Sequence, residues 1–174
     1  MAQGRGKQKM GGLKKAMAAL ALLVVIGGCA IGTQRGYMMA PDTANYTDKY
    51  VDYSFYDTTG KPLGLGGEAK PFNKGGTGGV ECCAVLPGPG ESLRITWNEE
   101  TDDDDPARKR TYTKDVVVTG SQPISGTSHN YLIVRFFPTQ QLEVEFISEP
   151  VSGPRSPRRD RIFFGEHVMR HMGE

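Results

Sequence analysis

The sequence has few of the residues and patterns that mark enzymes and cofactor-binding proteins. Only three histidines and three cysteines occur among its 174 residues. None of Ser121, Ser125 and Ser128 lies in a Gly-x-Ser-x-Gly motif, and no Gly-Lys-Ser/Thr follows the glycine-rich stretch, which argues against a hydrolase or a phosphate loop. His167 and His171 are four residues apart but lack the zinc-protease pattern around them. We therefore expect no enzyme activity, no metal and no cofactor.

Long hydrophobic runs are missing as well. The longest apolar run, residues 16–26, has 11 residues, whereas a helix that spans a bilayer needs about 20. A basic segment without acidic residues precedes this run, which is typical of a secretory signal peptide. The run leads into Ile26-Gly27-Gly28-Cys29, which resembles the lipobox of bacterial lipoproteins. A short membrane anchor, or a buried hydrophobic helix with an incidental cysteine, is the alternative.

The lipobox resemblance implies a processed and anchored protein. In lipoproteins the cysteine receives acyl chains such as palmitate and becomes the first residue of the mature chain. Residues 1–28 would therefore be removed and Cys29 lipidated. Because Ala30 rather than aspartate follows the cysteine, the resemblance favours the periplasmic face of the outer membrane.

Neither acidic nor basic residues are in large excess in the mature chain. The removed segment holds five of the 21 basic residues and no acidic one, which leaves 16 basic against 20 acidic residues. The mature chain is therefore near −4, although the whole chain is +1. A mildly acidic domain of this kind argues against nucleic acid as the partner.

Glycine and proline are abundant and favour an all-β fold. They number 34 of 174 residues, and convincing helical patterns are lacking. We expect a small antiparallel β-sandwich or meander with long Gly/Pro-rich loops, in which Trp97 is buried, Glu143 and Glu145 face solvent, and 138–141 form a hairpin turn. The predicted strands are residues 50–55, 81–86, 93–97, 112–119, 131–137 and 142–147.

Four regions follow from these patterns. Residues 1–28 are the signal peptide, 29–46 the lipidated cysteine and a flexible tether, 47–150 the β domain, and 151–174 a Pro/Arg-rich C-terminal tail. Within the β domain, residues 60–79 hold eight glycines and are predicted to be a long flexible loop. Within the tail, 162–172 could form a short helix.

Cys82 and Cys83 are adjacent, which leaves several states open. They could form a disulfide with each other, remain as buried thiols, or pair between molecules in the oxidising periplasm. Neighbouring side chains of an ideal strand point to opposite faces, so a bridge within the pair needs a local distortion. Their spacing fits neither a Cys-x-x-Cys redox motif nor a zinc site.

The segment around these cysteines resembles a known family. Gly-Gly-Thr-Gly-Gly-Val-Glu-Cys-Cys-Ala-Val-Leu-Pro, at residues 75–87, is similar to the signature of small proteobacterial lipoproteins whose domain has no assigned function. The resemblance extends over roughly residues 36–148 and includes 46–51, 90–97 and 134–144. This chain departs from the family between Pro87 and the next Pro-Gly pair, and in the acidic run 102–105.

Members of that family are often encoded beside lipase toxins of type VI secretion. The resemblance therefore implies an immunity lipoprotein that binds and inhibits a secreted phospholipase effector. The alternative is a structural or assembly lipoprotein of the envelope without a toxin partner. The acidic run lacks the ligand spacing of a calcium loop and is predicted to be a solvated loop. Its charge and the adjacent polar loop 120–130 supply the predicted partner contacts, which are Asp102, Asp103, Asp104, Asp105, Ser125 and His129.

Overall fold

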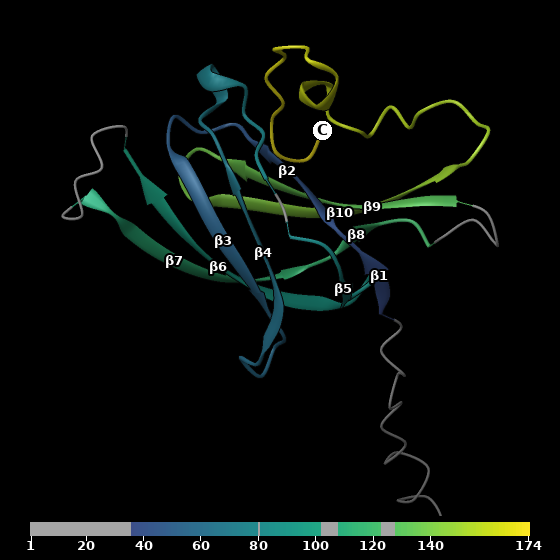
Figure 1. Cartoon of the computed structure of the whole chain (residues 1–174), viewed down its shortest axis with the longest axis horizontal. Coiled ribbons are helices and arrows are strands. Elements are labelled where there is room, and N and C mark those ends of the chain that lie inside the picture. Colours follow the sequence, from purple (N-terminus) through teal and green to yellow (C-terminus); the bar gives the residue numbers. More distant parts are fainter. Residues whose placement is uncertain (1–35, 80, 102–107, 123–127) are drawn as a thin grey trace, which may run out of the picture. The chain divides into compact units, whose positions relative to one another are not determined.

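Three β-sheets make up the part of the chain that the computed structural model describes, which is residues 36–79, 81–101, 108–122 and 128–174 (Figure 1). Ten strands and short 3-10 turns lie in these residues, and no α-helix occurs among them. The predicted all-β class is therefore confirmed. The signal peptide and Cys29 lie outside the described residues. Within those ranges, no helix is long and apolar enough to cross a membrane.

The first four-stranded sheet is antiparallel throughout and has the order β4-β3-β6-β7. Side chains alternate between the core and the outer face along β3 and β6, as the sequence predicts. Trp97 is 2% exposed and lies opposite Tyr53 in the register. The strand bounds are Tyr50–Tyr56 for β3, Pro62–Ala69 for β4, Ser92–Glu100 for β6 and Arg110–Val117 for β7.

The second four-stranded sheet is mixed and has the order β2-β9-β10-β8. β9 and β10 form the predicted antiparallel hairpin, whereas β2 runs parallel to β9 and β8 runs parallel to β10. A third, two-stranded sheet pairs β1 with β5. The strand bounds are Tyr37–Met39 for β1, Pro41–Asn45 for β2, Ala84–Leu86 for β5, Thr119–Gly120 for β8, Ser128–Phe137 for β9 and Gln141–Pro150 for β10.

The core lies between the inner faces of the two larger sheets. One cluster of buried side chains includes residues of both, among them Ile95 of the first sheet and Val144 of the second. The Phe136 ring lies 5.4 Å from the Tyr53 ring and 5.8 Å from the Trp97 ring, measured between centroids. Aromatic pairs at such distances add to the free energy gained by burial. The domain is therefore sandwich-like.

The prediction of a loop over 60–79 is wrong for residues 62–69, which form β4. The glycines of β4 allow it to pack closely against β3. A Cβ atom on Gly66 would lie 2.4 Å from the carbonyl oxygen of Tyr53, and one on Gly67 would lie 2.7 Å from the Tyr53 hydroxyl. Side chains at these positions would push β4 away from β3. A high glycine content therefore does not indicate flexibility in this segment.

The predicted tether 29–46 also needs correction, because residues 37–45 lie in β1 and β2. β2 has no clear alternation, since four of its five residues are buried. One face of β2 packs towards the core, where Thr43 shares a hydrogen bond with Tyr53. On the other face, Ala44 packs in a second apolar cluster with Ile162. A strand covered on both faces lacks the period of two that sequence reasoning relies on.

The C-terminal segment, residues 151–174, folds back beside β2 instead of forming a free tail (Figure 1). Its 3-10 helix η3 spans Arg161–Phe164, so the short helix expected in 162–172 occurs only in part. Ile162 is 6% exposed and Asp160 is 2% exposed. The segment thus covers part of the outer face of the second sheet and shields polar side chains there.

A buried charge cluster joins the C-terminal segment to the second sheet. Arg135 of β9 has no exposed side-chain surface, and its Nε donates to both carboxylate oxygens of Asp160, at 2.9 and 2.8 Å. Its Nη1 donates to Glu143 at 2.7 Å and to Glu145 at 2.6 Å. The prediction that Glu143 and Glu145 face solvent is therefore wrong: Glu145 is buried and Glu143 is largely shielded.

Candidate binding surface

The glycine-rich segment 77–81 is positioned by the outer edge of β4. The Glu68 amide donates to the Gly79 carbonyl at 2.9 Å, and the Lys70 amide donates to the Thr77 carbonyl at 3.2 Å. Further along, the Glu81 amide donates to the Gly66 carbonyl at 3.3 Å. These bonds follow an antiparallel register, so the segment covers an edge that would otherwise expose unpaired backbone groups.

Close approach between this segment and β4 requires glycine. A Cβ atom on Gly78 would lie 1.8 Å from the Glu68 carbonyl oxygen, a distance that no side chain can adopt. Gly76 has a φ of 64° and is buried against the Asn45 carbonyl. The glycines of the motif at 75–79 therefore allow the chain to run beside β4, where Glu81 lies next to Gly66.

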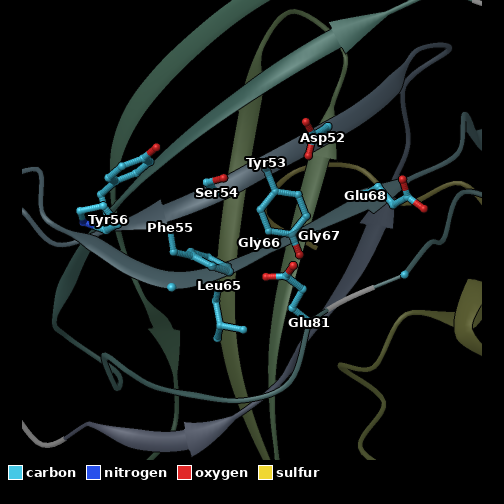
Figure 2. Close-up of a pocket in the computed structure, with 13 residues that line it drawn as sticks. Asp52, Tyr53, Ser54, Phe55, Tyr56, Leu65, Gly66, Gly67, Glu68 and Glu81 are labelled. Atoms are coloured by element: carbon cyan, nitrogen blue, oxygen red, sulfur yellow. The ribbon is translucent and has the colours of Figure 1, made fainter.

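A groove lies where β3 and β4 meet Gly79 and Glu81 (Figure 2). Its volume is about 580 Å³, and Tyr56 and Pro62 are among its lining residues. Gly64 and Gly66 also line it and contribute backbone without side chains. An adjoining hollow of about 630 Å³ shares Asp52, Glu68 and Gly79 with the first. The two hollows thus lie side by side.

Three carboxylates give the groove a negative charge. Asp52 of β3 lies directly opposite Glu68 of β4 in the strand register, and Glu81 lines the same hollow. Figure 2 shows Asp52, Glu68 and Glu81 on three adjacent segments. Like charges opposite one another on a sheet repel. Within the described part of the chain, no ion pair neutralises any of the three.

Among the described residues, two cations lie beside this charge, and one of them, Lys70, lines the second hollow. Lys109 pairs with Glu100, which lines the second hollow. The pKa of the Lys109 ammonium is raised, first by its hydrogen bond to Glu100 and in smaller part by the charges of Glu100 and Asp52. The charged form of Lys109 is therefore stabilised mainly by its partner Glu100.

Cys82 and Cys83 directly follow Glu81 and are joined by a disulfide. Both residues are exposed, and the peptide bond between them is cis. The sequence leaves several states open for this cysteine pair. The structure contains one of them, the disulfide between Cys82 and Cys83. The disulfide lies between the segment that borders the groove and β5, which pairs with β1.

Of the partner contacts predicted from the sequence, the structure describes only His129, which does not line this groove. His129 is exposed on β9, opposite Glu149 of β10, and is not among the residues that line either hollow. Asp102, Asp103, Asp104, Asp105, Ser125 and the lipidation site Cys29 lie outside the described residues. In the ranges that are described, no group of three or more His, Cys, Asp or Glu side chains is arranged to hold a metal ion.

Sequence reasoning missed the groove carboxylates for a specific reason. Asp52 could be recognised from the sequence as an outward position of a strand. Its cross-strand neighbour Glu68 lies in β4, and the glycines of β4 led to the prediction of a loop there. The glycines before Glu81 could have indicated this arrangement, because a segment that packs closely along a strand edge requires glycine. No model of a known protein family matches this chain, and no curated protein matches it either.

Proposed function

We propose that the mature protein is an immunity lipoprotein, held at the periplasmic face of the outer membrane by acyl chains on Cys29, that binds and inhibits a type VI secretion phospholipase. The resemblance of residues 75–87 to a lipoprotein family found beside such lipases suggests the partner. The observation that carries the proposal is the acidic groove, in which Asp52, Glu68 and Glu81 lack ion pairs within the described residues.

Inhibition would proceed by occlusion, without chemistry on the part of this chain. A basic surface beside the mouth of the lipase active site would dock against the three carboxylates. Docking would offset the repulsion expected between Asp52 and Glu68, which lie directly opposite one another. The glycines of β4 allow the partner backbone to approach closely. The lipid anchor keeps the inhibitor where the toxin arrives and raises its effective concentration.

Co-expression with the lipase encoded beside this gene tests the proposal. The wild-type protein is expected to protect a bacterial host from the periplasmic lipase. The triple variant Asp52→Lys, Glu68→Lys and Glu81→Lys should lose protection, because its surface repels a basic partner. Asp48→Lys is the matched control: it reverses an exposed carboxylate that lies outside the groove.

Circular dichroism and membrane fractionation of each variant establish that folding and anchoring are intact. If the lipase kills cells equally with and without the wild-type protein, the inhibitor proposal is wrong. If the triple variant protects as well as the wild type, inhibition does not depend on the groove. An envelope defect on deletion of the gene in cells without the lipase would instead favour the structural or assembly role.

A further inference from the structure

The two-stranded sheet of β1 and β5 presents an apolar face to solvent (Figure 1). Alternate side chains of its strands point to opposite faces. Met39 and Leu86 are buried in the core, whereas Met38 and Val85 point outward and are 68% and 54% exposed. Met38 lies directly opposite Val85 in the strand register. We call these two outward side chains the ribbon patch.

The segments that carry the ribbon patch contain no charged residue. Residues 36–41 and 82–90 lack aspartate, glutamate, lysine and arginine, although 24% of the chain is charged. The disulfide of Cys82 and Cys83, both exposed, directly precedes β5. Charged side chains are costly to transfer from water into lipid, so a face without them is compatible with the interface of a bilayer.

The chain enters the domain beside the ribbon patch. Gly36 directly precedes β1, and a Cβ atom on it would lie 2.0 Å from Cγ1 of Val85. Cys29, the proposed lipidation site, is seven residues before Gly36. Seven residues span at most about 25 Å when fully extended. Acyl chains on Cys29 would therefore keep a membrane surface within that distance of the ribbon patch.

The size of the ribbon patch favours lipid over protein as its occupant. A stable protein interface buries about 800 Å² on each partner, which is far more than two side chains on three-residue strands can supply. A weak contact is sufficient where an anchor already holds the domain at a membrane, because the second binding event is then intramolecular. The length of the anchoring segment and the size of the patch thus agree on the same occupant.

We propose that the ribbon patch is the surface on which the domain rests against the bilayer, with Met38 and Val85 in the interfacial layer of the lipid. This inference rests on the proposed acylation of Cys29, but not on the identity of the protein partner. The contact sets which face of the domain meets the membrane. Glu81 of the groove lies four residues before Val85, which is at most about 14 Å along the chain. The groove is therefore held near the surface on which a phospholipase acts.

Methyl NMR of the acylated mature protein in lipid nanodiscs tests this contact. The discs contain phosphatidylethanolamine, phosphatidylglycerol and a nitroxide-labelled lipid, which broadens nearby signals. The Met38 methyl signal should broaden strongly. Met169 and Met172, which are 43% and 47% exposed, are internal controls because they belong to the C-terminal segment, where the Gly173 amide donates to Glu143 of β10. Equal broadening of the three signals, or stronger broadening of the two controls, would overturn the proposal.

Val85→Asp probes the patch while leaving Met38 in place as the reporter. The added carboxylate should remove the broadening of the Met38 signal, because it disfavours contact with lipid. Val168→Asp is the matched control, since Val168 is an exposed valine of the C-terminal segment, and it should leave the broadening unchanged. Unchanged broadening in Val85→Asp would contradict the proposal. A dimer of the detergent-solubilised wild type that Val85→Asp dissociates would assign the face to a second copy instead.

Intact mass and vesicle flotation separate failure of this contact from failure of the anchor. An acylated protein that floats with vesicles but shows no broadening at Met38 would overturn the ribbon patch and leave the anchor standing. A mature protein without the mass of acyl chains would overturn the anchor, and this contact with it. If Val85→Asp fails to fold, the wild-type comparison of Met38 with Met169 and Met172 decides the question alone.

Discussion

Arg135 shows how strongly one side chain can connect distant parts of this chain. Burial acts against its charged form, but hydrogen bonds and the charges of Asp160 and Glu145 outweigh burial and raise its pKa above the usual value. Glu145 in turn accepts from Arg158 at 2.7 Å. The guanidinium therefore holds two segments, β10 and the C-terminal segment, against β9.

Replacing Arg135 should be strongly destabilising. In Arg135→Met, Asp160 and Glu145 would remain buried without their main cation, so we expect a loss of about 3–5 kcal/mol in the free energy of unfolding. Urea denaturation measures this loss. The control Arg94→Gln removes the exposed pair with Asp115, and should cost about 1 kcal/mol or less. Equal effects of the two substitutions would contradict a dominant role for the buried cluster.

Two buried tyrosines should make the protein sensitive to alkaline pH. Burial raises the pKa of Tyr53 above 10.0, and burial together with the hydrogen bond to Asp160 raises that of Tyr46. Because the neutral phenols are favoured in the folded state, their contribution is complete below pH 10 and is lost as pH rises above it. Each should lower the free energy of unfolding by up to about 1.4 kcal/mol per pH unit.

Urea titrations between neutral pH and the alkaline range measure this dependence. Tyr46→Phe removes one titrating group and should reduce the slope above pH 10, although it also removes the bond to Asp160 and lowers stability at neutral pH. The exposed carboxylate Asp48 supplies a control, Asp48→Asn, that should leave the alkaline slope unchanged. A wild-type slope of zero above pH 10 would show that the tyrosines ionise equally in both states.

At the scale of elements, β4 and segment 77–81 depend on one another. The segment donates and accepts backbone hydrogen bonds along the outer edge of β4, and Gly78 makes the close approach possible. The groove and the exposed disulfide both lie at this junction. Its geometry therefore decides where Glu81 lies relative to the other two carboxylates.

Gly78→Val should separate segment 77–81 from β4. Its Cβ would overlap the Glu68 carbonyl, so the Glu68 and Lys70 amides should lose protection, at a cost of about 1–3 kcal/mol. Gly79→Ala is the matched control, since its Cβ would meet nothing closer than 3.8 Å. Hydrogen exchange measured by NMR reports both. Unchanged protection in Gly78→Val would show that this junction tolerates a side chain.

The strands that could be predicted are those with one covered face. β3 and β6 alternate, and sequence periodicity placed each within a few residues. β10 was also placed within a few residues, although its second face is covered as well. β2 was not predicted because both of its faces are covered. β4 was not predicted because it contains glycines, which here serve close packing. The parallel pairings of β2 and β8 depend on connections between distant segments, which no local pattern reveals.

Less of the candidate site than of the fold could be predicted from the sequence. The position of the cysteine pair was evident, but its bridge was one alternative among three. The groove arises from the register of β3 with β4, so Asp52 and Glu68 become neighbours only when that pairing is known. Arg135 was hidden for a similar reason: its main partner, Asp160, is 25 residues away, in a segment that composition describes as a tail.

At the scale of the whole molecule, charge is distributed unevenly. The groove presents three carboxylates, whereas residues 151–174 contain five arginines, most of them bound to carboxylates of the chain. Within the described residues, the groove thus presents carboxylates without ion pairs, whereas the C-terminal segment uses its charge for attachment. A soluble basic partner should be drawn to the groove at a rate that falls as salt screens the carboxylates.

The most direct measurement of the central claim is the affinity of the detergent-solubilised protein for the phospholipase proposed as its partner. Calorimetry should show saturable binding by the wild type and by Asp48→Lys. The variant with lysine at positions 52, 68 and 81 should bind at least about tenfold more weakly, which is about 1.4 kcal/mol. Binding that is absent in the wild type, or that is unaffected by reversing these three charges, would contradict an acidic groove that captures the lipase.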